Sequence, residues 1–205
     1  MSMQNISLTP ANQELRILIL RIVFVLMLPL IFFTRSAWPQ LAFEALEIIG
    51  VALVITAVLG RFWAILYIGG NKNQQIMQDG PYSICRHPLY LFSTIGVLGL
   101  GFMLGSIVLT LVLGLLTFVI LTATARREEA FLRGTFGDAY DRYSARVPMI
   151  LPRLSGFHTS PAVTFSVPHL RGNLFDALVF LAFIPLAATQ EMLAKFAVLP
   201  TFPIW

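Results

Sequence analysis

The sequence predicts an all-α membrane protein, a multi-pass transmembrane helical bundle of about five spans. Three observations predict it: 57% of the 205 residues are hydrophobic, only 12% are charged, and the mean hydropathy is +0.80. A soluble globule of this size needs more charged surface, so we expect the chain to lie in a bilayer. Long apolar runs then supply the spans, since each crossing takes about 20 residues. We expect one domain over residues 1–205, in a bacterial cytoplasmic membrane.

The first two spans are expected at Leu15–Thr34 and Glu44–Ile68. No small-residue cleavage pattern follows the first run, so it is not expected to be a cleavable signal. A short loop with Trp38 and Pro39 is typical of an interfacial connection. Arg61, near the end of the second span, is expected either to reach the interface or to face the protein interior.

The apolar run from Leu89 to Ala125 supplies the third and fourth spans. At 1.5 Å per residue, its roughly 37 residues are nearly twice as long as a bilayer core. Gly99–Ser106 is rich in small, flexible residues and predicts a tight helical hairpin. A last segment, Leu174–Thr189, carries Asp176 and is expected to span, with a re-entrant dip as the alternative.

The distribution of positive charge predicts the orientation. Outside the spans, ten lysines and arginines fall on the side of the N-terminus, whereas Arg35 and Lys195 fall on the other side. Cytoplasmic loops carry the excess of positive charge, so the N-terminal side is expected to be cytoplasmic. The net charge of +4 therefore reflects membrane-flanking positions and indicates no nucleic-acid partner.

A first polar cluster precedes the third span. Asp79-Gly80-Pro81 is a turn signature, and Pro88 suits the first turn of a helix, which places Arg86 and His87 at that helix's N-terminus. Free N–H groups there attract anions. The pair therefore either binds an anionic ligand or anchors the span at the interface. The lone cysteine, Cys85, is expected to be a small buried residue.

A second polar cluster, Glu128 and Glu129, follows the fourth span on the same face of the membrane. The glutamates either form ion pairs with nearby arginines or accept hydrogen bonds from a ribose diol or an ammonium group. Beyond them an apolar and aromatic stripe recurs every three or four residues, which predicts a helical segment that packs or lines a ligand: Leu132, Phe136, Tyr140, Tyr143 and Val147. Breaks are expected at Gly134 and Gly137, with Asp138 capping a short helix.

The sequence lacks the motifs of a metal site, a hydrolase triad and a Rossmann nucleotide site. The three histidines, His87, His158 and His169, have no spacing typical of a metal site, so none is expected. The sequence has no Gly-x-Ser-x-Gly elbow and no Gly-x-Gly-x-x-Gly loop, which argues against a hydrolase triad and a Rossmann nucleotide site.

Several of these elements resemble, in order, the signature of the isoprenylcysteine carboxyl methyltransferase and phospholipid methyltransferase superfamily. The elements are Gly-Pro-Tyr at 80–82, Arg-His-Pro-Leu-Tyr at 86–90, Glu-Glu at 128–129, Phe-Gly at 136–137, Tyr140, Tyr143 and Val147-Pro148. The match covers about residues 60–152 and leaves 153–205 as a C-terminal extension. The resemblance implies an integral membrane methyltransferase that uses S-adenosylmethionine, with a cytoplasm-facing cofactor pocket and a side opening to the bilayer for lipid-like acceptors.

The resemblance also implies the site residues. His87, Tyr90, Glu128 and Glu129 would contact the cofactor, and the walls of its pocket would be Tyr82, Pro88, Tyr140 and Tyr143. Arg86, His87 and Glu129 are the expected catalytic residues. Arg86 would orient an anionic acceptor, and His87 or a glutamate would take the proton from an amine or thiol. A carboxylate acceptor needs no base. The expected partners are membrane lipids and a lipophilic acceptor.

Two other functions stay open at this point. A non-catalytic membrane protein could keep the same fold as a binding or assembly module, and it would have no affinity for S-adenosylmethionine. A small-solute transporter is disfavoured because few polar residues lie inside the spans to form a path. A transporter would move solute across proteoliposomes without consuming methyl groups.

Overall fold

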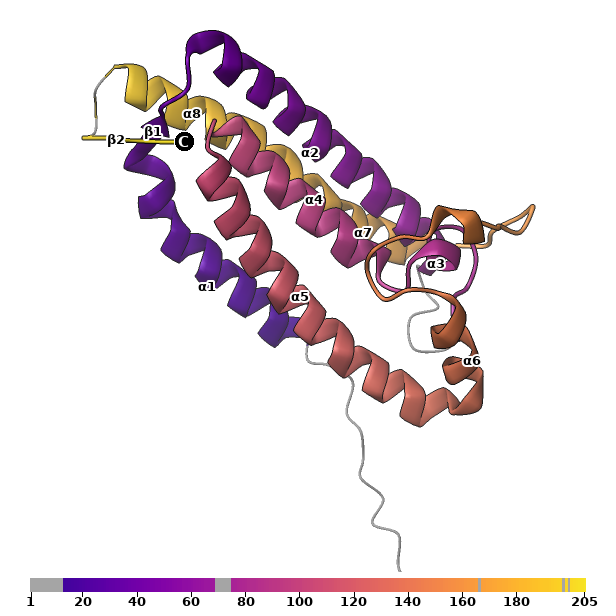
Figure 1. Ribbon diagram of the computed structural model, residues 1–205. Coiled ribbons are helices and arrows are strands. Elements are labelled where there is room, and N and C mark those ends of the chain that lie inside the picture. Colours follow the sequence, from indigo (N-terminus) through magenta and orange to yellow (C-terminus); the bar gives the residue numbers. More distant parts are fainter. Residues whose placement is uncertain (1–12, 69–74, 166, 197, 199) are drawn as a thin grey trace, which may run out of the picture.

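The computed structural model describes residues 13–68, 75–165, 167–196, 198 and 200–205, and it is mostly helical (Figure 1). The predicted helical class is confirmed. The polar stretch Gly69–Gln75, which follows the second expected span, lies outside the described residues except for Gln75.

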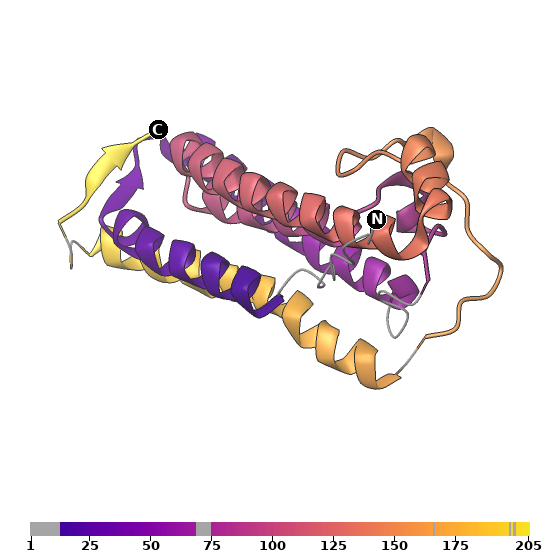
Figure 2. The ribbon, with the colours of Figure 1, turned by 90° about the horizontal axis from the view of Figure 1, so that it is seen from below.

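Long helices run back and forth along the bundle (Figures 1 and 2). They are α1 (Gln13–Phe32), α2 (Gln40–Ile68), α4 (Pro88–Met103), α5 (Ile107–Phe136) and a last pass made of α7 (Val167–Leu178), the 3-10 turn η2 (Val179–Ala182) and α8 (Phe183–Lys195). By length and composition, three segments could cross a membrane: Gln40–Ile68, Ile107–Phe136 and Leu170–Lys195. Ile17–Phe32 and Pro88–Met103 are shorter apolar helices.

The predicted hairpin between the third and fourth passes is present but tighter than expected. α4 continues to Met103 and α5 begins at Ile107, so the turn takes only residues 104–106. Gly105 supplies a positive φ of 62°, and the Ser106 hydroxyl accepts a hydrogen bond from Leu109 N at 3.1 Å, which caps α5. Gly99 is helical, and its missing side chain serves the packing of α4 against α2.

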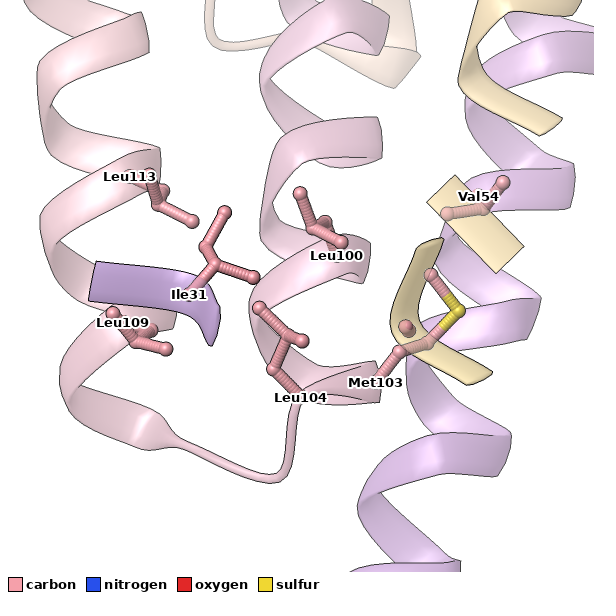
Figure 3. Close-up of a cluster of buried hydrophobic side chains, with 8 residues drawn as sticks. Ile31, Val54, Leu100, Met103, Leu104, Leu109 and Leu113 are labelled. Atoms are coloured by element: carbon pink, nitrogen blue, oxygen red, sulfur yellow. The ribbon is translucent and has the colours of Figure 1, made fainter. Parts of the chain in front are cut away.

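Helices α2 and α4 approach each other closely at Gly50 and Gly99. A Cβ atom added at Gly99 would lie 2.7 Å from the Gly50 carbonyl oxygen, and one added at Gly50 would lie 2.6 Å from Gly99 O. Lipid tails are as apolar as the side chains of a neighbouring helix, so burying those side chains does not drive helices together in a membrane. Close backbone contacts of this kind do. Around this pair the buried core joins α1, α2, α4, α5 and α8 (Figure 3) through Ile31, Val54, Leu100, Met103, Leu104, Leu109, Leu113 and Ala187.

The all-α prediction missed a two-stranded parallel sheet at the hairpin end of the bundle. β1 (Thr34–Ser36) pairs with β2 (Phe202–Ile204), and the backbone oxygen of Trp205 accepts hydrogen bonds from Val108 N and Ser106 Oγ, both at 2.9 Å. The strands have three residues each, too few for a period-2 pattern to reveal them in the sequence. The sheet ties the described C-terminal residues to the turn between α4 and α5.

The opposite end of the bundle is covered by short elements, α3 (Pro81–Ile84), α6 (Asp138–Arg146) and the 3-10 turn η1 (Leu154–Gly156) (Figure 1). Two predictions about this end were wrong. α5 continues through Gly134, because one glycine costs a helix only about 1 kcal/mol. Gly137, with a φ of 51°, is the cap between α5 and α6, and Asp138 is the first residue of α6.

Candidate active site

A cavity of about 900 Å³ extends from the end covered by α3 and α6 toward the buried core. Its lining includes His87 and Leu100, which lie about 20 Å apart along α4 at 1.5 Å per residue. We call one half the polar end; it is lined by Tyr82, Arg86, His87, Pro88, Tyr90, Glu128, Tyr140 and Tyr143. We call the other half the deep end; it is lined by Phe24, Val97, Leu100, Leu113, Phe180 and Phe183.

The polar end brings together the two clusters that are 42 positions apart in the sequence. Eight of the nine predicted site residues line this end of the cavity. The ninth predicted residue, Glu129, is buried behind them, in contact with Arg86 and His87. The structure therefore places every predicted site residue in or directly behind one wall of the cavity.

Backbone hydrogen bonds set the position of Arg86 and His87. The Arg86 amide donates to Pro148 O at 2.9 Å, and the His87 amide donates to Met149 O at 3.0 Å. His87 is also the N-cap residue of α4, with Pro88 in the first turn. The chain after α6 thus runs alongside the approach to α4, and this pairing explains why Val147-Pro148 accompanies the Arg-His-Pro motif.

Gly80 fixes the turn that carries Tyr82. Its φ is 59°, a conformation that favours glycine, and a Cβ atom there would lie 2.3 Å from the Tyr67 ring. The Ser83 hydroxyl donates to Gly80 O at 2.6 Å, and α3 begins at Pro81. These contacts bury Tyr82 against the cavity.

A buried ionic cluster forms the back of the polar end. Glu129 Oε1 lies 3.1 Å from His87 Nε2 and 3.2 Å from Arg86 Nε. Glu128 Oε2 lies 3.7 Å from His87 Nδ1, and none of the four side chains is more than 16% exposed. The His87 ring is parallel to that of Tyr90, with 5.4 Å between the ring centres. Glu129 therefore holds Arg86 and His87 in place, while Glu128 faces the cavity.

Three buried tyrosines complete the polar end. Tyr143 donates its hydroxyl to the Tyr82 backbone oxygen at 2.8 Å. The hydroxyls of Tyr82 and Tyr140 are buried and have no hydrogen-bond partner among the described residues. Burial is the main cause that raises the pKa of all three phenols, so they stay protonated and can donate at neutral pH. A buried hydroxyl without a partner is costly, and a polar ligand in the cavity would supply one.

Cys85 lies beside this site but is not a nucleophile. Its thiol is 1% exposed and donates to Ile150 O at 3.0 Å. Burial raises the pKa of the thiol to about 12, so the thiolate that would react is absent at neutral pH. The prediction of a small buried residue is confirmed.

Arg61, which was expected either to reach the interface or to face the protein interior, faces the interior. It lines the cavity between the polar and deep ends, and its Nη1 atom donates to Ser93 Oγ at 2.5 Å. The guanidinium carbon lies 5.3 Å from the centre of the Phe180 ring. An arginine inside an apolar span is the signal that could have assigned it, because such a residue is costly unless it faces the protein interior. Phe180 had no comparable signal.

Among the described residues, no group of three or more histidine, cysteine, aspartate or glutamate side chains could hold a metal ion. His158 lies outside the cavity, with its Nε2 atom 3.7 Å from Asp79 Oδ1. The side chain of His169 lies outside the described part of the chain.

Comparison with known proteins finds similarity over the segment that carries most of the polar end. The family model described as "Phospholipid methyltransferase" matches residues 44–139, which include α4 and both polar clusters. The "Protein-S-isoprenylcysteine O-methyltransferase" of Schizosaccharomyces pombe is 37% identical over 82 residues, which cover 40% of this chain and 35% of that protein. No solved structure matches the chain.

Two relatives cover most of the chain. The "Cobalt-zinc-cadmium resistance protein CzcN" of Cupriavidus metallidurans is 36% identical over 167 residues, 81% of this chain and 77% of that protein. The "Nickel-cobalt-cadmium resistance protein NccN" of Alcaligenes xylosoxydans xylosoxydans is 35% identical over 188 residues, 91% of this chain and 88% of that protein. Both similarities extend well beyond the part that the family model matches.

Proposed function

Because this chain belongs to the isoprenylcysteine carboxyl methyltransferase and phospholipid methyltransferase superfamily, we propose that it is an S-adenosylmethionine-dependent methyltransferase with a lipophilic acceptor. The observation that carries the proposal is one continuous cavity with a buried ionic cluster at one end and an apolar lining at the other. A charged cofactor fits the polar end, and an apolar acceptor fits the deep end.

The charges of the polar end suit this cofactor. In the ionic cluster, Glu129 contacts Arg86 and His87, and Glu128, which contacts His87, lines the cavity. S-adenosylmethionine carries an ammonium, a sulfonium and one carboxylate, a net positive charge. The hydroxyls of Tyr82 and Tyr140 add two buried donors that lack partners in the described chain. The Glu128 carboxylate suits the ammonium, and the two unsatisfied donors favour a polar ligand here.

The residues of the polar end have separate roles in this proposal. Glu128 and the Tyr82 and Tyr140 hydroxyls bind the cofactor, whereas Glu129 holds Arg86 and His87 from behind. When bound, S-adenosylmethionine supplies an electrophilic methyl group. The burial of the polar end excludes water, and alignment of the two reactants supplies most of the rate. An amine or thiol acceptor would lose its proton to His87 or Glu128, and a carboxylate acceptor would need no base.

We propose that the polar end faces the cytoplasm, because several arginines lie in the last part of α5 and in α6, near this end, and cytoplasmic segments carry the excess of positive charge.

The test is transfer of a labelled methyl group from S-adenosylmethionine into a lipid extract, followed by identification of the product. We expect a labelled lipophilic product from the full chain in nanodiscs and none from His87→Ala. Labelling by His87→Ala at the wild-type rate would contradict the site, and an unlabelled extract with the wild-type protein would contradict the function.

We also propose that the reaction contributes to heavy-metal resistance, since two relatives that cover most of the chain are named for it. A cell that lacks the gene should regain growth in cobalt or cadmium medium with the wild-type gene but not with His87→Ala. Equal rescue by both would favour the rival function, a non-catalytic binding or assembly protein.

A further inference from the structure

The chain between α6 and α7 exposes large apolar side chains at the end of the bundle that α3 covers (orange in Figure 1). Leu151, Leu154 and Phe157 are 71%, 72% and 52% exposed. Leu154 begins the 3-10 turn η1, and residues three apart in such a turn lie on the same side, so Leu154 and Phe157 share one face. Neighbouring apolar side chains that stay exposed indicate a surface that another molecule covers. We call residues 151–157 the surface segment.

Hydrogen bonds to α3 and its flanking residues hold the backbone on both sides of this face. Arg153 N donates to Ile84 O at 3.0 Å, and His158 N donates to Ser83 Oγ at 3.1 Å. The His158 carbonyl oxygen accepts a hydrogen bond from Gly80 N at 2.9 Å. The apolar face of η1 lies between these anchors, so it cannot turn into the core without breaking hydrogen bonds. Its exposure is therefore a fixed feature of the fold.

The surface segment lies beside the end of a helix that could cross a membrane. The Phe157 ring contacts that of Trp63 on α2, with 6.1 Å between the ring centres, and the hydroxyls of Tyr67 and Thr159 are 2.8 Å apart. Trp63 and Tyr67 lie in the last two turns of α2, one of the candidate spans. Tryptophan and tyrosine are enriched where a span meets the head groups. The apolar face of the surface segment therefore continues the surface of α2 at the level of the head groups.

The chain around this face is positively charged. Residues 142–158 contain three arginines and no acidic residue, and all three arginines are exposed. Arg153 Nη2 donates to Arg146 O, and Arg146 Nη2 donates to Gln78 Oε1 at 3.0 Å. Within the described part of the chain, neither guanidinium forms an ion pair with a carboxylate. Both cations are therefore held at the surface by neutral groups, which leave their charge available to an anion.

We propose that the surface segment docks on anionic phospholipids, with Leu154 and Phe157 in the head-group region of the bilayer. Arg146 and Arg153 would bind the lipid phosphates, since a guanidinium donates charge-assisted hydrogen bonds to phosphate oxygens. Apolar anchors flanked by basic residues are typical of segments that lie on an anionic membrane surface. A protein partner would have to reach this face through the head groups, because Phe157 contacts a spanning helix. The proposal does not depend on methyl transfer.

The first measurement locates the surface segment relative to the bilayer. A fluorophore is attached to Phe157→Cys in the full chain, in nanodiscs of phosphatidylcholine and phosphatidylglycerol; Cys85 is 1% exposed and should not be labelled. We expect lipids with a nitroxide near the head group to quench this fluorophore, and iodide in the water to quench it little. Asp141→Cys on α6 is the control, because an exposed carboxylate position should lie in water. There iodide should quench and the nitroxide lipids should not.

The second measurement tests the preference for anionic lipid. The fluorophore at position 157 should be quenched more by nitroxide-labelled phosphatidylglycerol than by nitroxide-labelled phosphatidylcholine at equal mole fraction. Arg153→Gln should lower this preference about fivefold, because each basic residue near the surface contributes about that factor. Arg133→Gln is the matched control, since that arginine is paired with Asp141, and it should change the preference less than about twofold.

Leu154→Ser separates docking from folding. The side chain is exposed, so thermal unfolding in detergent should match that of the wild type, whereas iodide quenching at position 157 should rise. Loss of stability in detergent would mean that Leu154 packs within the protein and would contradict its place in the head groups.

Three further results would overturn the proposal: equal iodide quenching at positions 157 and 141, equal quenching by the two lipids, or a lipid preference unchanged in Arg153→Gln. A fluorophore protected from both iodide and lipid nitroxides would assign the face to a second copy of the chain and would also overturn it. S-adenosylmethionine binding by the wild type is measured separately. Docking without cofactor binding would contradict the proposed function and leave this inference standing.

Discussion

The two ends of one cavity are built in different ways. At the polar end, the ionic groups are held by specific partners: Glu129 contacts Arg86 and His87, whose backbone amides donate hydrogen bonds to the carbonyl oxygens of Pro148 and Met149. At the deep end, the walls are apolar side chains from α1, α4, α5, η2 and α8, held by packing alone apart from the Arg61 contacts. We therefore expect the polar end to tolerate few substitutions. Substitutions at the deep end should change the preference for the acceptor without loss of cofactor binding.

Glu129→Ala should show the largest effect, because it leaves the Arg86 guanidinium buried without its carboxylate. We expect at least about a hundredfold loss of methyl transfer, and a loss of about 3 kcal/mol in the free energy of unfolding, typical of a broken buried pair. Labelled-methyl assays and thermal unfolding measure the two. Asp141→Ala, which breaks the exposed Arg133–Asp141 pair, is the control and should change neither. Wild-type stability in Glu129→Ala would show that the ionic cluster does not hold this end together.

Tyr140→Phe and Tyr143→Phe should have opposite consequences, although the rings are neighbours. The Tyr140 hydroxyl has no partner in the described chain, so its loss should weaken S-adenosylmethionine binding about tenfold and leave stability unchanged or slightly higher. The Tyr143 hydroxyl bonds to Tyr82 O, so its loss should cost about 1 kcal/mol of stability with little effect on binding. Calorimetric titration measures the affinity for S-adenosylmethionine, and thermal unfolding measures the stability. The reverse pattern would mean that the cofactor lies elsewhere.

Leu113→Val tests the deep end. Leu113 is 5% exposed at the floor of the cavity, and the loss of one methylene should cost about 1 kcal/mol of stability. S-adenosylmethionine affinity should change less than about twofold, while methyl transfer should shift toward acceptors with longer chains. A competition assay with acceptors of graded chain length measures the shift. An unchanged chain-length preference would show that the acceptor does not reach this floor.

The smallest expected effect is a pH dependence of stability from Cys85. Its folded pKa of about 12 lies above the ordinary value of 9.0, because burial disfavours the thiolate. The contribution is therefore fully present below pH 9 and is lost as the pH rises toward 12; from pH 9 to 10 the loss is about 1 kcal/mol. Thermal unfolding at these two values measures it, and Cys85→Ala should remove that part of the slope. An equally steep slope in Cys85→Ala would assign it to other groups.

The sequence carried enough information for the helices and for the polar end. Hydropathy and the small residues at 99–106 placed the hairpin within a few residues, and the ordered motifs from Gly80 to Val147 named the side chains that line the polar end. These features are local: a proline after His87 and a glycine at 137 determine the chain around them through their own backbone preferences.

The rest depends on contacts between distant segments. The β1–β2 pair joins residues 34–36 to 202–204, and two three-residue strands have no pattern of their own. Phe180 is one of 17 phenylalanines, and only its position over Gly96 and Arg61 distinguishes it. Of the two breaks expected at Gly134 and Gly137, only the one at Gly137 occurs, because a helix accepts one glycine but ends where φ becomes positive.

The most direct test of the account is calorimetric titration of the full chain in nanodiscs with S-adenosylmethionine, in the wild type, Glu128→Gln and Asp141→Asn. The account predicts saturable binding by the wild type and by Asp141→Asn, and at least about tenfold weaker binding by Glu128→Gln, whose carboxylate faces the cavity. No binding by the wild type, or equal affinity in Glu128→Gln, would contradict a cofactor site at the polar end.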